Sequence, residues 1–465
     1  MSFLIILAAL VFLMVAAYRG YSVILFAPVA ALAAVLLTDP VLVAPMFTGL
    51  FMDKMVGFLK NYFPVFLLGA VFGKVVELSG FSKSIVSSVI NLAGRKHAVF
   101  SIVAVCALLT YGGVSLFVVV FAVYPFAAEL FRQSGLPKRL IPATIALGAF
   151  TFTMDSLPGT PQIQNIIPIA FFKTNIYAAP WLGSIGAVFI LVAGLFYLQG
   201  CCRRAAVAGE GYGTTLLHEP EPFDHEHLAN PFIAILPLIV VGVLNLVFTW
   251  GIPRLYGDTH SFVPAVVGKT ALVTQEIAKV AAIWAVEGAL LAGIATVLVF
   301  AWKPVVTKFA EGSKSAVSGA LLASMNTASE YGFGAVIAAL PGFRAVADAL
   351  KAIPHPLINE AITVNLLAGM TGSASGGLSI ALAAMAETFL QNAHAAGISP
   401  EVLHRIAAMA SGGMDTLPHN GAVITLLTVT GLTHRQSYSN IFVITCIKTV
   451  AVFLVIAVYN FTGLV

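Results

Sequence analysis

The stretch TMDSLPGTP at residues 153–161 has a counterpart, GMDTLPHNG, at residues 413–421. Each stretch places an aspartate, a hydroxyl side chain and a proline inside a hydrophobic segment long enough to cross a bilayer. Proline removes a backbone donor and clashes with the preceding turn, so each helix should break there. Such a break is tolerated at membrane depth where it lines a cavity within the protein. The paired stretches therefore predict two broken helices that line a polar pathway.

A second pair of matching segments lies upstream of the two breaks. Residues 112–116 read GGVSL, and residues 376–380 read GGLSI. Because the matching segments occur in the same order, and each pair is separated by nearly the same number of residues, we expect inverted repeats. An N-terminal helix and the first repeat would occupy 1–200, a cytoplasmic linker 201–230, and the second repeat 231–465. Matching interrupted segments in two halves of a membrane protein point to the binding site of a transporter.

The composition limits the class of protein. The chain has 465 residues, of which 59% are hydrophobic and only 9% charged, and its mean hydropathy is +0.96. A soluble domain carries about 25% charged residues, so we expect an all-α polytopic membrane protein. The net charge of +4 is scattered, which argues against nucleic-acid binding. Four cysteines show neither metal-ligand spacing nor a disulfide framework, so we expect no metal and no cofactor.

Apolar segments of membrane-spanning length set the expected helix count. A span needs about 20 mostly apolar residues, which gives about 11 transmembrane helices here. Separate crossings are expected near 41–59 and 61–80, and again near 279–302 and 316–340. Two re-entrant hairpins are expected at about 97–131 and 356–390, with glycine-serine tips at the membrane middle. The broken helices should cover about 139–172 and 402–432.

The positions of basic residues favour a cytoplasmic N-terminus. In that orientation Lys138, Arg139, Arg203 and Arg204 fall inside, while a smaller group that includes Arg405 falls near the outer surface. The two hairpins then lie at opposite faces of the membrane. Inverted repeats require this relation.

The two halves of a broken helix offer opposite partial charges to a ligand. The first half ends in partially negative carbonyls, so Asp155 and Asp415 suit a proton or a cation there. The second half begins with amides that favour an anion. No Arg or Lys lies within either break, so amides and hydroxyls are expected to hold a substrate carboxylate.

Candidate site residues follow from this chemistry. The ion-coupling candidates are Asp155, Asp415, His419 and Glu330; the last two have no counterpart in the other repeat, and a structural hydrogen-bonding role stays open for them. The candidates for contacting substrate are Ser115, Thr160, Gln162, Ser373, Ser375, Ser379 and Asn420. The glycines that allow close backbone approach at hairpin tips and breaks are Gly112, Gly113, Gly376, Gly377, Gly159 and Gly421.

Both breaks resemble those of a known transporter family. MDSLPGTPQIQN at 154–165 and SGGMDTLPHNGA at 411–422 look like the gluconate permease family, and more narrowly its D-3-hydroxybutyrate permease branch. The resemblance runs over essentially the whole chain. It implies the ion transporter superfamily, a homodimer, an elevator-type motion, and proton symport of a small organic acid across the bacterial cytoplasmic (inner) membrane. Sugar-acid members carry a Pro-Pro-His-Pro-Gly type stretch where this chain has LPGTP at 157–161, which favours a smaller acid.

The expected function is therefore proton-coupled uptake of a small, 3-hydroxybutyrate-like carboxylate, and the protein is not expected to be an enzyme. The alternative is sodium-coupled symport of a di- or tricarboxylate, or symport of a gluconate-type sugar acid. An intramembrane aspartyl protease could use two buried aspartates that share a proton. The duplication of each aspartate with its own hairpin favours transport instead. A passive channel gives no reason for two ionisable breaks.

Overall fold

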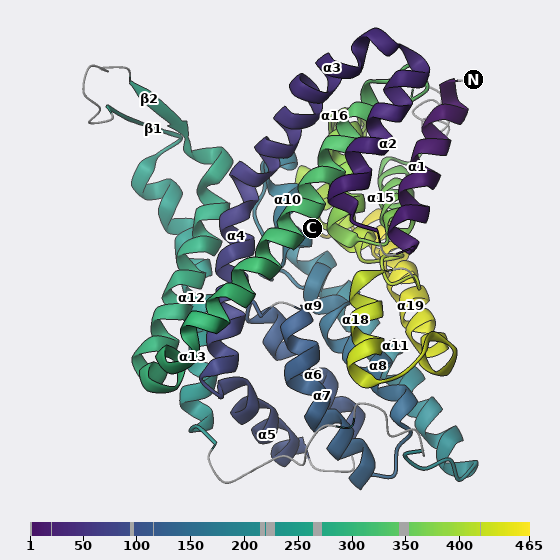
Figure 1. The fold of residues 1–465 in the computed structure, drawn as a ribbon. Helices are drawn as coiled ribbons and strands as arrows, with labels where there is room; N and C mark the ends of the chain where they lie inside the picture. Colours follow the sequence, from purple (N-terminus) through teal and green to yellow (C-terminus); the bar gives the residue numbers. More distant parts are fainter. Residues whose placement is uncertain are drawn as a thin grey trace.

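The computed structural model describes residues 2–19, 21–93, 97–114, 116–213, 219, 228–263, 272–343, 353–418 and 420–465. This part of the chain is mostly helical (Figure 1). By length and composition, five of its helices could cross a membrane: Pro40–Leu78, Pro180–Val207, Pro231–Tyr256, Val280–Ala339 and His434–Thr462. Several shorter helices are also apolar. The predicted helical membrane protein is supported, whereas the expected number of crossings is not.

The N-terminal third contains one long helical run where two crossings were expected. Helices α1 (Ser2–Tyr18) and α2 (Val23–Thr38) pack together. Then η1 (Pro40–Leu42), α3 (Val43–Pro45), η2 (Met46–Phe51) and α4 (Met52–Leu78) follow one another without a loop. The separate crossings at 41–59 and 61–80 were therefore wrong. Lys60 and Asn61 interrupt the hydropathy but are compatible with a helix, so the chain continues through them.

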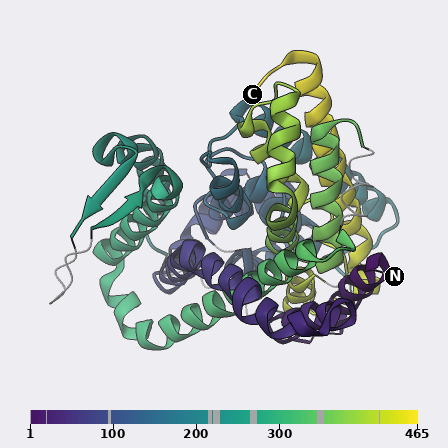
Figure 2. The same cartoon turned by 90° about the horizontal axis from the view of Figure 1, so that it is seen from above.

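The second half differs from the first, because its two expected crossings are separate helical segments. Helix α12 (Pro231–Tyr256) is followed by α13, which runs from Ile277 to Ala339. The expected crossings at 279–302 and 316–340 are joined by a kink at Ala301, where φ is −136° and ψ is 37°. Pro304 explains this kink, because its ring clashes with the preceding turn. In the view from above, α13 and α4 run beside each other (Figure 2).

A small β-ribbon departs from the all-α prediction. Strand β1 (Thr259–Phe262) pairs antiparallel with β2 (Val273–Glu276), with Thr259 opposite Glu276. β-Branched residues in both strands, and Phe262 in β1, suit this conformation. The ribbon projects from the end of α12 and the start of α13, away from the rest of the molecule (Figure 1).

Two helix pairs occupy the segments predicted as hairpins. After α5 (Phe81–Ala93), the chain forms α6 (Ala98–Tyr111) and α7 (Leu116–Gln133), and later α15 (Pro356–Thr371) and α16 (Ala374–Ala395). The turns contain Gly113 at φ +94° and Gly372 at φ +64°, a left-handed backbone that favours glycine. Gly376 and Gly377 were expected at the second tip. They lie instead in the first turn of α16, just after that tip.

Gly377 allows close contact between the two helices of the second pair. A Cβ atom added at Gly377 would overlap the backbone of Ala368. We expect Gly377→Ala to lower the free energy of unfolding by about 3 kcal/mol, because neither backbone can move aside cheaply. Thermal unfolding in detergent measures this change. Gly319→Ala is the matched control, because a Cβ there meets nothing within 4 Å, and its midpoint should not fall. An unchanged midpoint for Gly377→Ala would contradict the packing of α15 on α16.

The helices that carry the repeated Asp-x-Leu-Pro pattern are interrupted at that pattern. In the first half, η4 (Lys138–Leu140), α8 (Ile141–Ala149) and α9 (Phe152–Asp155) precede the break, and α10 (Ile163–Phe172) follows it. In the second half, α17 (Pro400–Ser411) precedes the break and α18 (Gly421–Thr430) follows it. Helices α11 (Pro180–Val207) and α19 (His434–Thr462) complete the two halves. The division into inverted repeats stays a prediction.

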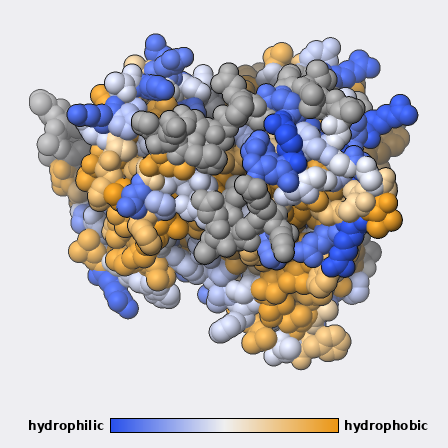
Figure 3. Space-filling view, turned by 90° about the horizontal axis from the view of Figure 1, so that it is seen from below, coloured by the Kyte–Doolittle hydropathy of each residue, from blue (hydrophilic) through white to orange (hydrophobic). Residues whose placement is uncertain are grey.

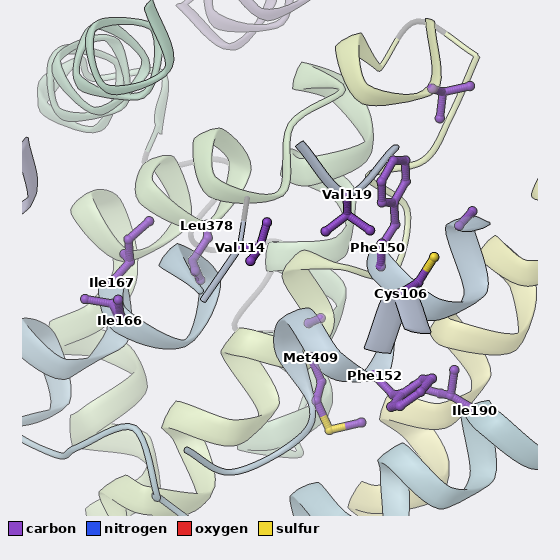
Figure 4. Close-up of a cluster of buried hydrophobic side chains, with 14 of the residues drawn as sticks. Cys106, Val114, Val119, Phe150, Phe152, Ile166, Ile167, Ile190, Leu378 and Met409 are labelled. Carbon is purple, nitrogen blue, oxygen red and sulfur yellow. The ribbon is translucent and has the colours of Figure 1, made fainter. Parts of the chain in front are cut away.

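An apolar core surrounds the interruptions. Figure 4 shows one cluster of buried side chains that includes Val114 and Leu378 from the two helix pairs, and Ile166 and Met409 from the two broken helices. Many large hydrophobic residues are also exposed. On the face seen from below they form broad areas between hydrophilic patches (Figure 3). Such a surface suits lipid contact, while the core holds the breaks inside protein.

Candidate functional site

The two breaks meet at Asp155. Its side chain is 2% exposed, and its Oδ1 accepts a hydrogen bond of 2.7 Å from Ser156 Oγ. Its Oδ2 lies against Gly412 at the end of α17, where an added Cβ would overlap it. This oxygen has no hydrogen-bond partner among the described residues. The aspartate of the first break is therefore next to the backbone of the second break and keeps one acceptor unused.

Asp415 has a different partner from its counterpart. Lys448 of α19 donates to Asp415 Oδ1 at 2.7 Å and to the carbonyl of Phe150 at 2.8 Å. Both charged side chains are almost fully buried, Lys448 at 1% and Asp415 at 5% exposure. Phe150 follows the last residue of α8, where partially negative carbonyls favour a cation. Lys448 thus ties the first broken helix to the second.

A buried guanidinium makes a further link between the halves. Arg405 of α17 is fully buried and donates to the carbonyl of Ala178 at 2.8 Å and to that of Asp155 at 3.1 Å. It also donates to Asn165 Oδ1 at 3.1 Å. Asn165 in turn donates to the carbonyls of Thr160 and Ile176, so its amide fixes the loop around the first break. Arg405, which was expected near the outer surface of the membrane, is thus enclosed by protein, and its depth in the membrane stays a prediction.

Polar side chains at the starts of α10 and α18 contact the helix-pair tips. Gln162 precedes α10 and donates to the carbonyl of Thr110 at 2.7 Å. Asn420 precedes α18 and donates to the carbonyl of Gly372 at 2.7 Å, while its Oδ1 accepts from the amide of Val423. Each break is thus fastened to the tip of its own half. Thr160, the third candidate here, donates to the carbonyl of Thr153 across the break.

The remaining polar candidates group at the start of α16. Ser373 accepts from the amide of Gly376, and Ser375 lies 3.2 Å from Thr327 Oγ1 of α13. Glu330 of α13 is 3% exposed, and its Oε2 lies against Gly376. Ser379 is fully buried, and its hydroxyl has no partner within the described ranges.

The remaining glycine candidates serve the turns and the helix starts. Gly159 adopts φ +85° beside Tyr177, Gly112 abuts Leu238, Gly113 abuts Leu290, and Gly421 begins α18. Ser115 and His419 lie outside the described residues.

Lys448 and Arg405 contact the breaks but are not among the predicted site residues. No Lys or Arg lies inside either break, and these two side chains reach the breaks from outside them. Lys448 had a signal of its own, since it is the single charged residue of the apolar segment 441–462. A charge within a membrane segment is costly and marks a partner or a pathway. Nothing in the sequence marks Arg405 in the same way. It lies near the start of the expected broken helix at 402–432, where a position at the membrane surface fits the sequence equally well.

The arrangement can bind a proton or a small cation. Three oxygens in this region lack a donor among the described residues and each lies against a glycine: Asp155 Oδ2 on Gly412, Asn365 Oδ1 on Gly413, and Glu330 Oε2 on Gly376. A buried acceptor without a donor is costly, and a bound proton or cation removes that cost. Within the described part of the chain, no group of three His, Cys, Asp or Glu side chains could hold a metal ion.

Comparisons with known proteins identify relatives over the whole chain. No protein-family model matches. The "Uncharacterized transporter YxjC" of Bacillus subtilis (strain 168) is 57% identical over 474 residues, with 100% of both chains covered. The fold is similar to the YdaH transporter of Alcanivorax borkumensis, with a TM-score of 0.54, 13% identity, and 92% and 90% of the two chains covered. MtrF of Neisseria gonorrhoeae gives a TM-score of 0.49, 14% identity, and coverage of 88% and 84%.

Proposed function

The chain belongs to the family of membrane transporters that includes Bacillus subtilis YxjC, and from this premise we propose that it carries a small organic acid across the membrane together with a proton. The resemblance of both breaks to the gluconate permease family supports an organic acid. The LPGTP stretch at 157–161 favours a short hydroxy- or monocarboxylate similar to 3-hydroxybutyrate. An elevator-type motion, a homodimer and a location in the bacterial cytoplasmic membrane belong to the same proposal.

The observation that carries proton coupling is the unequal environment of the two aspartates. Lys448 neutralises Asp415 directly. Asp155 accepts from Ser156 on one oxygen, and its other oxygen has no donor among the described residues. A proton on this second oxygen would remove an uncompensated buried charge. Asp155 is therefore our candidate for the residue that binds the coupling proton. Asp415 is the ion-pair partner of Lys448, whose ammonium group contacts both breaks.

The same region offers positive potential to a carboxylate. Helices α10 and α18 begin at the breaks, and their first amides point toward the interruption. A helix start carries about half a positive elementary charge, which favours an anion. Arg405 adds a positive charge beside the first break, whereas the charge of Lys448 is balanced by Asp415. A carboxylate and a proton that enter together leave the total charge of the site unchanged, which keeps the cost of burial low.

Uptake into proteoliposomes tests this proposal. Radiolabelled 3-hydroxybutyrate should accumulate under an inward proton gradient, and a protonophore should abolish accumulation. We expect Asp155→Asn to reduce accumulation to the level seen without a gradient, because asparagine cannot bind the coupling proton. Asp415→Asn should do the same for a different reason, because it leaves Lys448 as a buried charge without its partner between the two breaks. Asp53→Asn on the exposed face of α4 is the matched control and should accumulate normally. Unchanged accumulation by both site variants would refute the assignment.

Sodium coupling is the second candidate, and one observation favours it. Asn365 Oδ1 lies against Gly413 and Asp155 Oδ2 against Gly412, so two acceptors without donors flank the end of α17. Oxygen ligands and the partially negative end of a helix suit a hard cation. In the same proteoliposomes, a sodium gradient at constant pH would then drive uptake of a di- or tricarboxylate. The absence of any response to sodium would exclude this candidate.

A further inference from the structure

The start of α16 packs tightly against the last part of α13. Ser375 contacts Thr327 through their hydroxyls, and Gly376 lies against the carboxylate of Glu330. One turn further, a Cβ at Gly334 would come 2.8 Å from the Cα of Ile380. The two helices therefore run side by side, and Glu330 lies beside the first turn of α16.

This first turn is suited to an anion. Helix α16 has 22 residues, and Ser373 precedes it in an extended conformation. The Ser373 side chain accepts from the amide of Gly376, and its carbonyl accepts from the amide of Gly377. The amides of Ala374 and Ser375 have no acceptor within the helix. Free amides and the helix dipole together favour a carboxylate at this position.

A carboxylate of the protein lies beside this turn, where a Cβ of Gly376 would be. Glu330 is 3% exposed, and its Oε2 has no hydrogen-bond donor among the described residues. No Lys or Arg of the described residues forms an ion pair with it. The buried side chain is thus placed against the anion-favouring turn without a counter-ion.

The neighbouring elements supply few ionisable groups. Tyr331 follows Glu330 on α13 and packs on Phe58 of α4 and Phe171 of α10. Tyr62 of α4 donates its hydroxyl to the carbonyl of Ile167. The charged residues at the start of α4 are exposed, namely Asp53, Lys54 and Lys60. Helices α2 and α10 contain no charged residue, and the first turn of α16 presents only serine, alanine and glycine.

We propose that deprotonated Glu330 occupies the anion-binding start of α16 and that its protonation frees this place for the carboxylate of the substrate. The proton enters from water and forms an O–H bond on Glu330, so one negative charge is lost as the substrate brings one. This inference rests on the proposed function and adds a second titrating group to it. Asp155 carries the coupling proton, while Glu330 controls whether substrate can bind.

The inference predicts the direction of the pH dependence. At high pH Glu330 is charged and competes with substrate, so the apparent affinity is low; at low pH Glu330 is neutral and the affinity is high. Above the pKa of such a group, the binding-competent fraction falls about tenfold per pH unit, and the apparent affinity falls with it. Substrate KM should therefore rise steeply with pH in the wild type.

Counterflow of radiolabelled 3-hydroxybutyrate, with equal pH on both sides, measures this KM without a driving gradient. From about pH 7 to about pH 9.5 we expect a wild-type KM that rises at least about tenfold, and a Glu330→Gln KM that changes less than about twofold, because burial without a counter-ion disfavours the charged form of a carboxylate. Gly376→Ala should behave like Glu330→Gln, because its new methyl group overlaps only the end of the Glu330 side chain and displaces it. Glu287→Gln, a half-buried carboxylate on the same helix, is the control and should keep the wild-type dependence.

The outcomes separate the two proposals. Loss of the pH dependence in either Glu330→Gln or Gly376→Ala, with its retention in Glu287→Gln, supports the role of Glu330. A wild-type dependence that persists in the tested variants overturns that role and leaves carboxylate transport intact. A wild-type KM that does not change with pH also overturns it. Absence of wild-type counterflow for every carboxylate tried would instead refute the proposed function.

Discussion

Replacement of Lys448 by methionine is expected to destabilise the protein by about 3–5 kcal/mol, because it leaves Asp415 as a buried charge without its partner. The ammonium group binds both Asp415 Oδ1 and the carbonyl of Phe150, so its removal also loosens the two broken helices from each other. The midpoint of thermal unfolding in detergent measures the loss. Lys303→Met, at an exposed position of α13, should leave the midpoint close to that of the wild type.

A double variant tests the reason for that loss. If the unpaired charge of Asp415 dominates, Asp415→Asn combined with Lys448→Met should recover most of the stability lost by Lys448→Met alone. Removal of both partners of a buried pair is commonly close to neutral. The double variant should nevertheless fail to accumulate substrate under a proton gradient. If the double variant instead loses as much stability as the two single variants added together, the two residues do not interact.

Replacement of Arg405 by methionine is expected to cost more than about 3 kcal/mol, which is in the range typical of a broken buried network. The guanidinium donates to the carbonyls of Asp155, Ile176 and Ala178 and to Asn165 Oδ1. Each buried acceptor left without a donor costs about 1–3 kcal/mol. Size-exclusion chromatography and thermal unfolding should both show the loss of a well-folded protein.

Arg405→Lys separates charge from shape. Lysine keeps the positive charge but lacks the planar fork that reaches several acceptors at once, so we expect it to recover only part of the stability. Arg435→Met, at an exposed position near the start of α19, is the matched control and should be neutral. Full recovery with lysine would mean that charge alone matters at residue 405.

The places where helices stop could be predicted from the chain because their causes are local. Proline cannot continue a helix, and glycine tolerates the turns at Gly113 and Gly372. Hydropathy, by contrast, detects apolar stretches but not the turns between them. Lys60 therefore suggested a chain reversal, although residues 40–78 continue as helix, whereas the change of direction suggested near Lys303 is present as the kink at Ala301.

The amino-acid sequence by itself determined a helical membrane protein with paired polar breaks, because composition and proline position act through nearby residues alone. It presented Asp155 and Asp415 as equivalents. Tertiary structure decided their difference: Lys448 lies 33 residues from Asp415 along the chain, and Arg405 lies 250 residues from Asp155. Buried charges require partners, but the choice of partner depends on which distant helices pack together. No local pattern encodes that choice.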